Sequence, residues 1–204
     1  MPVLAFNVFF PSDFPVVGPH TDCDRIRKYV SRAAAALNRI GARIVVLGSG
    51  RARYVPDGWE RGRSEEQFLQ LLSWMGDEFD GSGVTVAIEP LNKKETNLIN
   101  CVSEAVAFAS QVNRRSIRVL ADFYHMDEEN EPLDTLVEHK DWLAHIHLAD
   151  TGRLSPGTGQ YPYDQFAQAL TKAGYTGLLS AECSVKHPDE ELPAALEFMR
   201  KKFN

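Results

Sequence analysis

Four residues that can bind a metal ion follow one another along the chain, each at or near the end of an apolar run. Glu89 ends VTVAIE, Asp122 ends RVLAD, His147 lies in HIHLAD and Glu182 ends LLSAE. A single acid in such a place is more often a helix cap or a turn former, but a succession of them is hard to explain as caps. Carboxylates held together would raise one another's pKa unless a cation neutralised them. A set of carboxylates and one imidazole suits Mn²⁺, Mg²⁺ or Co²⁺, and it lacks the thiolates of structural zinc.

The stretch LAHIHLADTGR, residues 143–153, contains a pair of histidines separated by one residue. In a strand, the two-residue period places His145 and His147 on the same face. A buried histidine that only hydrogen-bonds the backbone is the ordinary alternative for either residue. His147 lies nearer the end of the strand and is the expected metal ligand. His145 lies deeper, and we expect a core histidine there, or one that hydrogen-bonds a ligand carboxylate.

A repeating pattern of strand, turn and helix must position these residues. The first strand is predicted in VLAFNVFF, and residues 22–40 carry apolar side chains at helical spacing up to Gly41. The next unit has a buried strand in ARIVVLGSG and a helix over residues 64–79, opened by a capping box of Ser64 and Gln67. The remaining units have strands in VTVAIEP, IRVLADF, LAHIHLAD and GLLSAEC, and helices around residues 102–112, 133–139, 164–173 and 189–202.

Apolar strands that alternate with helices indicate a parallel sheet buried on both faces. A doubly wound sheet would carry a glycine-rich phosphate loop after its first strand, and FFPSDFPVVGP is not such a loop. Chemistry at the ends of several strands is instead typical of a TIM-barrel-like parallel sheet. A full barrel has eight units in about 250 residues. This chain has 204 residues, so we expect an α/β protein with an incomplete barrel of about six βα units.

The segments that carry the candidate ligands also carry a resemblance to a known family. IEPLNKKETN, LADFYHM, HIHLADTGR and SAEC, with VVLGSGRARYVPDG upstream, resemble the xylose-isomerase-like sugar isomerase/epimerase superfamily. Within it, the resemblance is strongest to the D-tagatose and D-psicose 3-epimerases. The resemblance implies a single xylose-isomerase-like βα-barrel domain over residues 1–204. The match starts at the family's third strand, so this barrel is expected to be shortened at its N-terminal end.

The resemblance also implies roles for individual residues. The residues that match the family's ligands to one divalent metal ion are Glu89, Asp122, His147 and Glu182. Mn²⁺ is the expected ion, with Co²⁺, Mg²⁺ and Zn²⁺ as alternatives. The residues that match the family's contacts to substrate oxygens are Glu95, His125 and Arg153.

The expected reaction is proton transfer at a carbon next to a carbonyl group. It requires an electrophile that stabilises the enediolate and a base close to the C–H bond. A divalent cation supplies the electrophile, and Glu89 and Glu182, on nonadjacent strands, can supply bases on opposite faces of the substrate. Return of the proton to the same carbon from the other face is epimerisation. Return to the neighbouring carbon is aldose–ketose isomerisation, and the sequence leaves both open.

Several residues have structural alternatives. Glu95 could be a solvated loop charge, His125 a loop histidine whose hydrogen bonds are satisfied, and Arg153 a surface partner of Asp150. The segment GSGRAR could hold a phosphate through its glycine amides, or it could be a tight turn between a strand and a helix.

Composition restricts the classes of partner. The formal net charge is −6 and the basic residues are scattered, apart from a cluster formed by Arg51, Arg53, Arg61 and Arg63. A protein that binds nucleic-acid phosphates usually has a basic face, so we expect no nucleic-acid partner.

The cysteines and the N-terminal segment bear on the cellular location. The cysteines lie far apart without CxxC spacing, as reduced cytoplasmic thiols do; they are Cys23, Cys101 and Cys183. The N-terminal apolar run of about nine residues fits neither a signal peptide nor a membrane span. We therefore expect a cytoplasmic location.

The incomplete barrel leaves alternatives open for the function. An open sheet exposes two edges, so we expect a homo-oligomer, a dimer that covers the gap, acting on a sugar or a sugar-like small molecule. A truncated protein that binds a sugar and a metal without turnover is the alternative. A hydrolase similar to endonuclease IV is less consistent, because such enzymes need additional histidines and this chain has SPGTGQ where one pair is expected.

Overall fold

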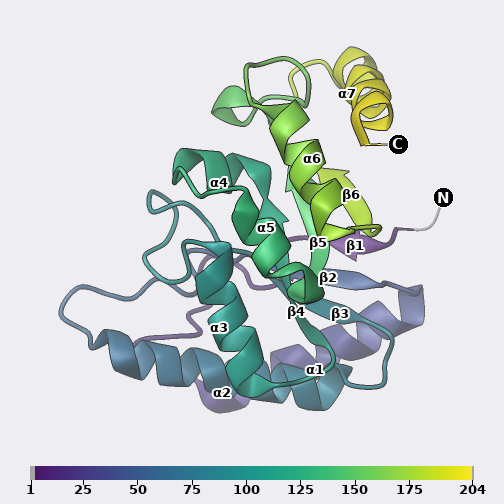
Figure 1. Cartoon of the computed structure of the whole chain (residues 1–204). Coiled ribbons are helices and arrows are strands. Elements are labelled where there is room, and N and C mark those ends of the chain that lie inside the picture. Colours follow the sequence, from purple (N-terminus) through teal and green to yellow (C-terminus); the bar gives the residue numbers. More distant parts are fainter. Residues whose placement is uncertain (1–2, 204) are drawn as a thin grey trace.

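In the computed structural model, which describes residues 3–203, six parallel strands form one curled sheet with the order β1 to β6 (Figure 1). The strands are β1 (Ala5–Phe6), β2 (Ile44–Leu47), β3 (Thr85–Ile88), β4 (Ile117–Asp122), β5 (Leu143–Leu148) and β6 (Leu178–Ala181). Within the described residues, β1 and β6 do not pair with each other, so the sheet is a half-barrel open along one seam. The predicted incomplete barrel of βα units is confirmed. Met1, Pro2 and Asn204 of the predicted domain lie outside the described residues.

Apart from the short helix that follows β4, the helices pack against one another in chain order around the sheet (Figure 1). They are α1 (Cys23–Ile40), α2 (Arg61–Phe79), α3 (Val102–Val112), α4 (Phe123–Glu128), α5 (Asp134–Glu138), α6 (Tyr163–Ala173) and α7 (Pro188–Phe203). Two 3₁₀ turns, η1 (Lys140–Trp142) and η2 (Thr151–Arg153), precede and follow β5. In the described part of the chain, no helix combines the length and apolar character needed to cross a bilayer.

The ends of α1 follow from its sequence, as predicted. The Asp22 side chain accepts a hydrogen bond from the Arg25 amide, which caps the free N–H groups of the first turn. Gly41 ends the helix with φ of 74°, a left-handed conformation that glycine adopts without strain. The buried stripe that faces the core consists of Ile26, Val30, Ala34 and Leu37.

The predicted start of α2 is wrong. The helix begins at Arg61, one turn before the proposed capping box, and Ser64 is buried inside it. An ion pair between Arg61 and Glu65 supports the additional turn. Gln67 does not cap the helix, because its side chain exchanges two hydrogen bonds with the backbone of Gly18.

The first strand is shorter than predicted, and one helix is absent from the prediction. Pairing in β1 stops at Phe6, and Val8 interrupts the extended backbone with φ of 53°. The helix α4 forms directly after β4, because the Asp122 side chain accepts hydrogen bonds from the amides of Tyr124 and His125. Its sequence of six residues is too short for a periodic pattern.

The central strands β2 to β5 are mostly buried on both faces, whereas β1 and β6 are half-buried or exposed. All the strands bring their carboxyl ends to one rim. The main core lies between the sheet and the helices, and a smaller cluster inside the curve contains Ile44, Val46, Ala87 and Leu120. Asp122 lies opposite His147 in the register of β4 and β5. Because the strands are parallel, residues that follow β3, β4, β5 and β6 meet at the same rim.

Candidate metal centre

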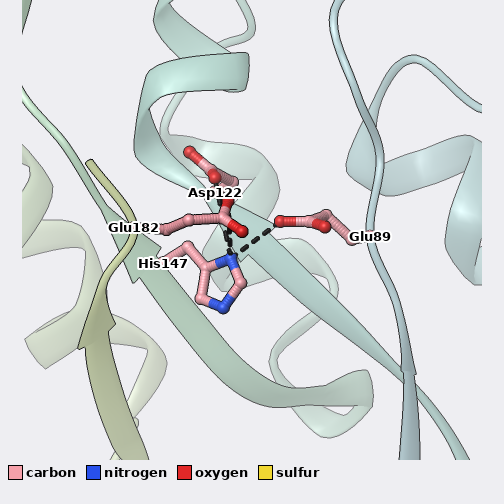
Figure 2. A group of neighbouring side chains, drawn as sticks. All are labelled: Glu89, Asp122, His147 and Glu182. Carbon is pink, nitrogen blue, oxygen red and sulfur yellow. Dashed lines mark hydrogen bonds and ion pairs between the residues drawn. The ribbon is translucent and has the colours of Figure 1, made fainter. Parts of the chain in front are cut away.

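The rim of the half-barrel brings the four expected metal ligands together (Figure 2). Glu89 follows β3, Asp122 ends β4, His147 lies in β5 and Glu182 follows β6. One ligand atom from each residue lies within 4.8 Å of the others. Glu89, Asp122 and His147 are buried, whereas the Glu182 side chain keeps 22% of its surface exposed. The site is therefore open to solvent on the side of β6.

The imidazole of His147 lies at the centre of the carboxylates, and its Nδ1 faces all of them (Figure 2). Nδ1 is 2.7 Å from Glu89 Oε1, 3.4 Å from Glu182 Oε2 and 3.7 Å from Asp122 Oδ2. Burial lowers the pKa of His147, but its interactions with these carboxylates outweigh burial and raise the pKa to about 12. The carboxylates thus favour a positive charge at this point.

The two glutamates have opposite pKa shifts because their surroundings differ. Burial raises the pKa of Glu89 to about 7, and the nearby charges of Glu182 and Asp122 add to the effect, while His147 opposes it. Burial also raises the pKa of Glu182, but hydrogen bonds and charges from His147 and Arg153 outweigh it and lower the pKa to about 2. Environments that separate the pKa values of two carboxyl groups are typical of sites that move protons.

The residues fit a divalent cation. Asp122 Oδ2 is buried and has no hydrogen-bond partner among the described residues, so a ligand oxygen is left free. Gly48, at the end of β2, makes room for the neighbouring carboxylate, because a Cβ there would overlap Glu89 Oε2. Carboxylate oxygens with one imidazole nitrogen are a donor set for Mn²⁺ and similar ions.

Arg53 supports the centre from inside the fold. It is 1% exposed, and burial lowers its pKa to about 10. Its guanidinium donates hydrogen bonds to the carbonyl oxygens of Glu89 at 2.6 Å, Leu47 at 2.8 Å and Leu98 at 3.0 Å. These bonds tie the backbone of Glu89 to the end of β2 and to the loop before α3. Nothing in the sequence distinguished Arg53 from the exposed Arg51.

Arg153 connects the metal centre to the outer residues. Its guanidinium donates to Glu182 Oε2 at 2.8 Å and to Glu95 Oε1 at 3.0 Å. The alternative pairing with Asp150 is wrong, because Asp150 is buried and accepts hydrogen bonds from backbone amides of the following loop. The guanidinium also lies 5.3 Å from the centre of the Tyr124 ring, a cation–π contact that the sequence did not reveal.

His125 lies beside the same residues and offers a hydrogen-bond donor. Its Nδ1 accepts a hydrogen bond from the backbone amide of Asn92 at 3.2 Å, and burial lowers the pKa of His125. In the neutral ring, this contact places the proton on Nε2. Nε2 is buried and has no partner within the described residues. Glu95 joins this group, because the Asn92 side chain donates to Glu95 Oε1 at 3.3 Å. His125 is thus a residue of α4 with an unsatisfied nitrogen, and not a satisfied loop histidine. Glu95 lies in a turn with 36% of its side chain exposed, but it is paired with Arg153.

His145 is fully buried below the centre, as expected of a core histidine, and the alternative contact with a ligand carboxylate is not formed. Its Nε2 lies 2.9 Å from the hydroxyl oxygen of Ser180 on β6. Its ring contacts the His147 ring edge-on, with centroids 5.2 Å apart. Burial lowers the pKa of His145 to about 4, so the imidazole is neutral.

A cavity of about 310 Å³ lies beside Glu95, and its volume is at the small end of the range for small-molecule sites, about 300–1,000 Å³. Its lining includes Val8, Phe10, Ser49, Arg51, Lys94 and Glu95. Glu95 belongs both to this lining and to the bridge with Arg153. A small molecule in the cavity would therefore reach the group that contacts the metal centre.

Comparison with known proteins identifies the family to which this chain belongs. Residues 2–202 match the family described as xylose isomerase-like TIM barrel. A ketose 3-epimerase from Arthrobacter globiformis is 28% identical over 166 residues, 78% of this chain and 57% of that protein. A D-psicose 3-epimerase from Enterocloster bolteae is 31% identical over 143 residues, 66% of this chain and 46% of that protein. The chain thus spans about half the length of the curated relatives it matches.

The fold is also similar to solved structures. The crystal structure of the apo form of a 3-keto-D-glucoside 4-epimerase from E. coli superimposes with a TM-score of 0.83 at 21% identity. The superposition covers 98% of this chain and 80% of the E. coli chain. At this identity the likeness concerns the fold alone.

Proposed function

Since the chain belongs to the xylose isomerase-like TIM barrel family, we propose that it is a divalent-metal-dependent sugar isomerase or epimerase that moves a proton at a carbon next to a carbonyl group. The convergence of Glu89, Asp122, His147 and Glu182 at the rim of the half-barrel carries this proposal. Relatives named ketose 3-epimerase and D-psicose 3-epimerase suggest a ketose as the substrate.

Glu89, Asp122, His147 and Glu182 would hold the metal ion, and Mn²⁺ is the ion we propose. When bound, the cation supplies the electrophile that makes the neighbouring C–H group acidic. Asp122 and His147 are the most deeply buried of the four and anchor the site. The carboxylates of Glu89 and Glu182 come from nonadjacent strands.

Glu89 and Glu182 are the proposed acid–base pair. They approach the centre from β3 and β6, so each can face one side of a substrate bound between them. One carboxylate removes the proton from carbon, and the other carboxyl group returns a proton from the opposite side. Return to the same carbon inverts its configuration, whereas return to the neighbouring carbon exchanges an aldose and a ketose.

The outer residues would bind the substrate. Arg153 can donate to a substrate oxygen that acquires negative charge, since its guanidinium already lies against Glu182. The free Nε2–H of His125 can donate to a carbonyl or hydroxyl oxygen. Glu95, which lines the cavity, can accept a hydrogen bond from a hydroxyl group farther along the sugar.

The second candidate is a protein that keeps the metal centre but does not turn over a sugar. The observation that favours it is the open seam, because β1 and β6 do not pair within the described residues. The single domain over residues 1–204, the cytoplasmic location and the dimer that covers the open seam stay predictions.

Assays with a panel of ketoses separate the two candidates. The purified protein, stripped of metal and then loaded with Mn²⁺ or Co²⁺, should interconvert at least one pair of epimers or isomers. Glu182→Gln should abolish this activity, whereas Glu190→Gln, at an exposed position in α7, should not. Metal-loaded wild-type protein that is inert across the whole panel would refute the enzymatic function and leave the binding protein.

A further inference from the structure

The position of Glu182 is less restricted by packing than that of the other three residues of the centre. The side chains of Glu89, Asp122 and His147 are at most 5% exposed, whereas that of Glu182 is 22% exposed. Glu182 follows β6, an edge strand whose residues are all exposed or half-buried. Its orientation must therefore depend on specific hydrogen bonds.

Both carboxylate oxygens of Glu182 are held, and they are held from opposite sides of the open seam. Arg153, after β5, donates to Oε2 at 2.8 Å. Asn7, directly after β1, donates from its side-chain Nδ2 to Oε1, also at 2.8 Å. Because β1 and β6 do not pair within the described residues, this amide is a side-chain bridge across the seam between them.

The backbone after Asn7 is held in an unusual conformation that fixes the direction of the chain. Val8 has φ of 53°, a left-handed conformation that a β-branched residue rarely adopts. The next two amides are anchored, because Phe9 donates to the Val46 carbonyl at 3.2 Å and Phe10 donates to the Ser49 hydroxyl at 2.8 Å. Such conformations persist where the surroundings determine them, often at functional sites.

We propose that Asn7 is a positioning residue for Glu182, the base proposed above, and this inference rests on that proposed function. With Oε1 occupied by the Asn7 amide, Oε2 is the oxygen that faces His147 and the centre of the site. A neutral amide suits this task, since it donates a hydrogen bond to the ionised carboxylate without adding charge and without a proton that titrates. Arg153 and Asn7 together fix the plane of the carboxylate that packing leaves free.

The test combines three variants with two readouts of the site. Asn7→Ala removes the side chain, Asn7→Leu keeps its approximate size without a donor, and Asn7→Gln keeps the amide. Asn38→Ala is the matched control, because Asn38 is exposed on α1, far along the chain from the centre. The readouts are Mn²⁺ affinity, by titration of the metal-free protein, and kcat and KM for the ketose that the wild-type protein converts. Melting temperature is recorded for each variant.

We expect Asn7→Ala and Asn7→Leu to weaken Mn²⁺ binding about tenfold and to lower kcat about ten- to a hundredfold, as for other residues that orient a ligand. KM should change much less than kcat, because Asn7 contacts Glu182 and not the substrate. Asn7→Gln should recover part of both losses, and Asn38→Ala should match the wild type.

Other results overturn the inference. If Mn²⁺ affinity and kcat are unchanged in Asn7→Ala and Asn7→Leu while the melting temperature falls, Asn7 only joins the edges of the sheet. Failure of the proposed function looks different, because the wild-type protein itself would then be inert on every ketose. In that case the Mn²⁺ titrations still decide the role of Asn7, and a wild-type protein that binds no Mn²⁺ refutes both proposals.

Discussion

Replacing Gly48 by alanine should disable the metal centre and leave the fold intact. The backbone of Gly48 is not in the left-handed region, so alanine can adopt its conformation. The added Cβ, however, would overlap Glu89 Oε2 and would lie 3.0 Å from Glu89 Cδ. Because non-bonded heavy atoms prefer separations of about 3.5–4.0 Å, the carboxylate must move by roughly 1 Å or more.

The size of the effect follows from that displacement. A misplacement of about 1 Å at a reacting group costs about a hundredfold in rate. This corresponds to about 2.7 kcal/mol of lost transition-state stabilisation, at about 1.36 kcal/mol for each factor of ten. We therefore expect Gly48→Ala to lower kcat/KM for the ketose at least about a hundredfold and to weaken Mn²⁺ binding at least about tenfold.

The measurement pairs Mn²⁺ titration and steady-state kinetics with urea unfolding. Gly62→Ala, in α2, is the matched control, since a Cβ at Gly62 would meet no atom within 4 Å. This control should keep wild-type affinity and gain about 0.5–1 kcal/mol of stability, as helical glycine-to-alanine changes do. If Gly48→Ala binds Mn²⁺ and turns over like the wild type, Glu89 does not act from the position seen here.

Three further changes test other parts of the structure. Arg53→Met should lower the free energy of unfolding by about 2 kcal/mol or more, because the carbonyls of Glu89 and Leu98 lose their donor and each buried carbonyl left unpaired costs about 1–3 kcal/mol; a loss below about 1 kcal/mol in urea titrations would contradict this. Arg153→Lys keeps the charge but loses the planar fork that reaches Glu95 and Glu182 from two separate nitrogens, so kcat/KM should fall about tenfold or more. Equal values in the two proteins would show that the bridge is dispensable. Burial raises the pKa of Glu131 to about 7 from 4.5, so the folded state holds its proton more tightly and gains stability below pH 4.5 that is lost as the pH rises to about 7. Urea unfolding should then show that the free energy of unfolding falls less between pH 5 and pH 8 in Glu131→Gln than in the wild type. Equal falls in the two proteins would exclude this contribution of Glu131.

The parts of the fold that the sequence predicts are those in which local pattern and tertiary packing agree. In α1, the apolar residues at helical spacing and the stop at Gly41 indicate the same helix, and the structure contains it. The capping box at Ser64 and Gln67 has the right residue types in the wrong place. The Gln67 side chain instead exchanges hydrogen bonds with the backbone of Gly18. Gly18 is distant in sequence, so no local sequence pattern predicts this contact.

In the candidate site, too, the residues set by local pattern could be predicted and those set by long-range contacts could not. The expected ligands could be found because each lies at or near the end of an apolar strand, and parallel strands bring such residues to one rim. Arg53 and Asn7 could not be found in this way, since their roles depend on contacts with residues far along the chain. Asn7 lay inside a run that resembled a continuous strand, and the left-handed turn at Val8 has no signature in residue type.

Deuterium incorporation from solvent tests the proposed proton transfer most directly. A base that returns a proton from the opposite side takes that proton from water between turnovers, so the product carries solvent hydrogen. In D₂O with Mn²⁺, the wild-type protein should introduce deuterium at the carbon next to the carbonyl of its ketose, as detected by NMR. The label should be absent without metal and in Glu182→Gln. If the metal-loaded wild-type protein introduces no deuterium into any ketose of the panel, the proposed chemistry of Glu89 and Glu182 is wrong.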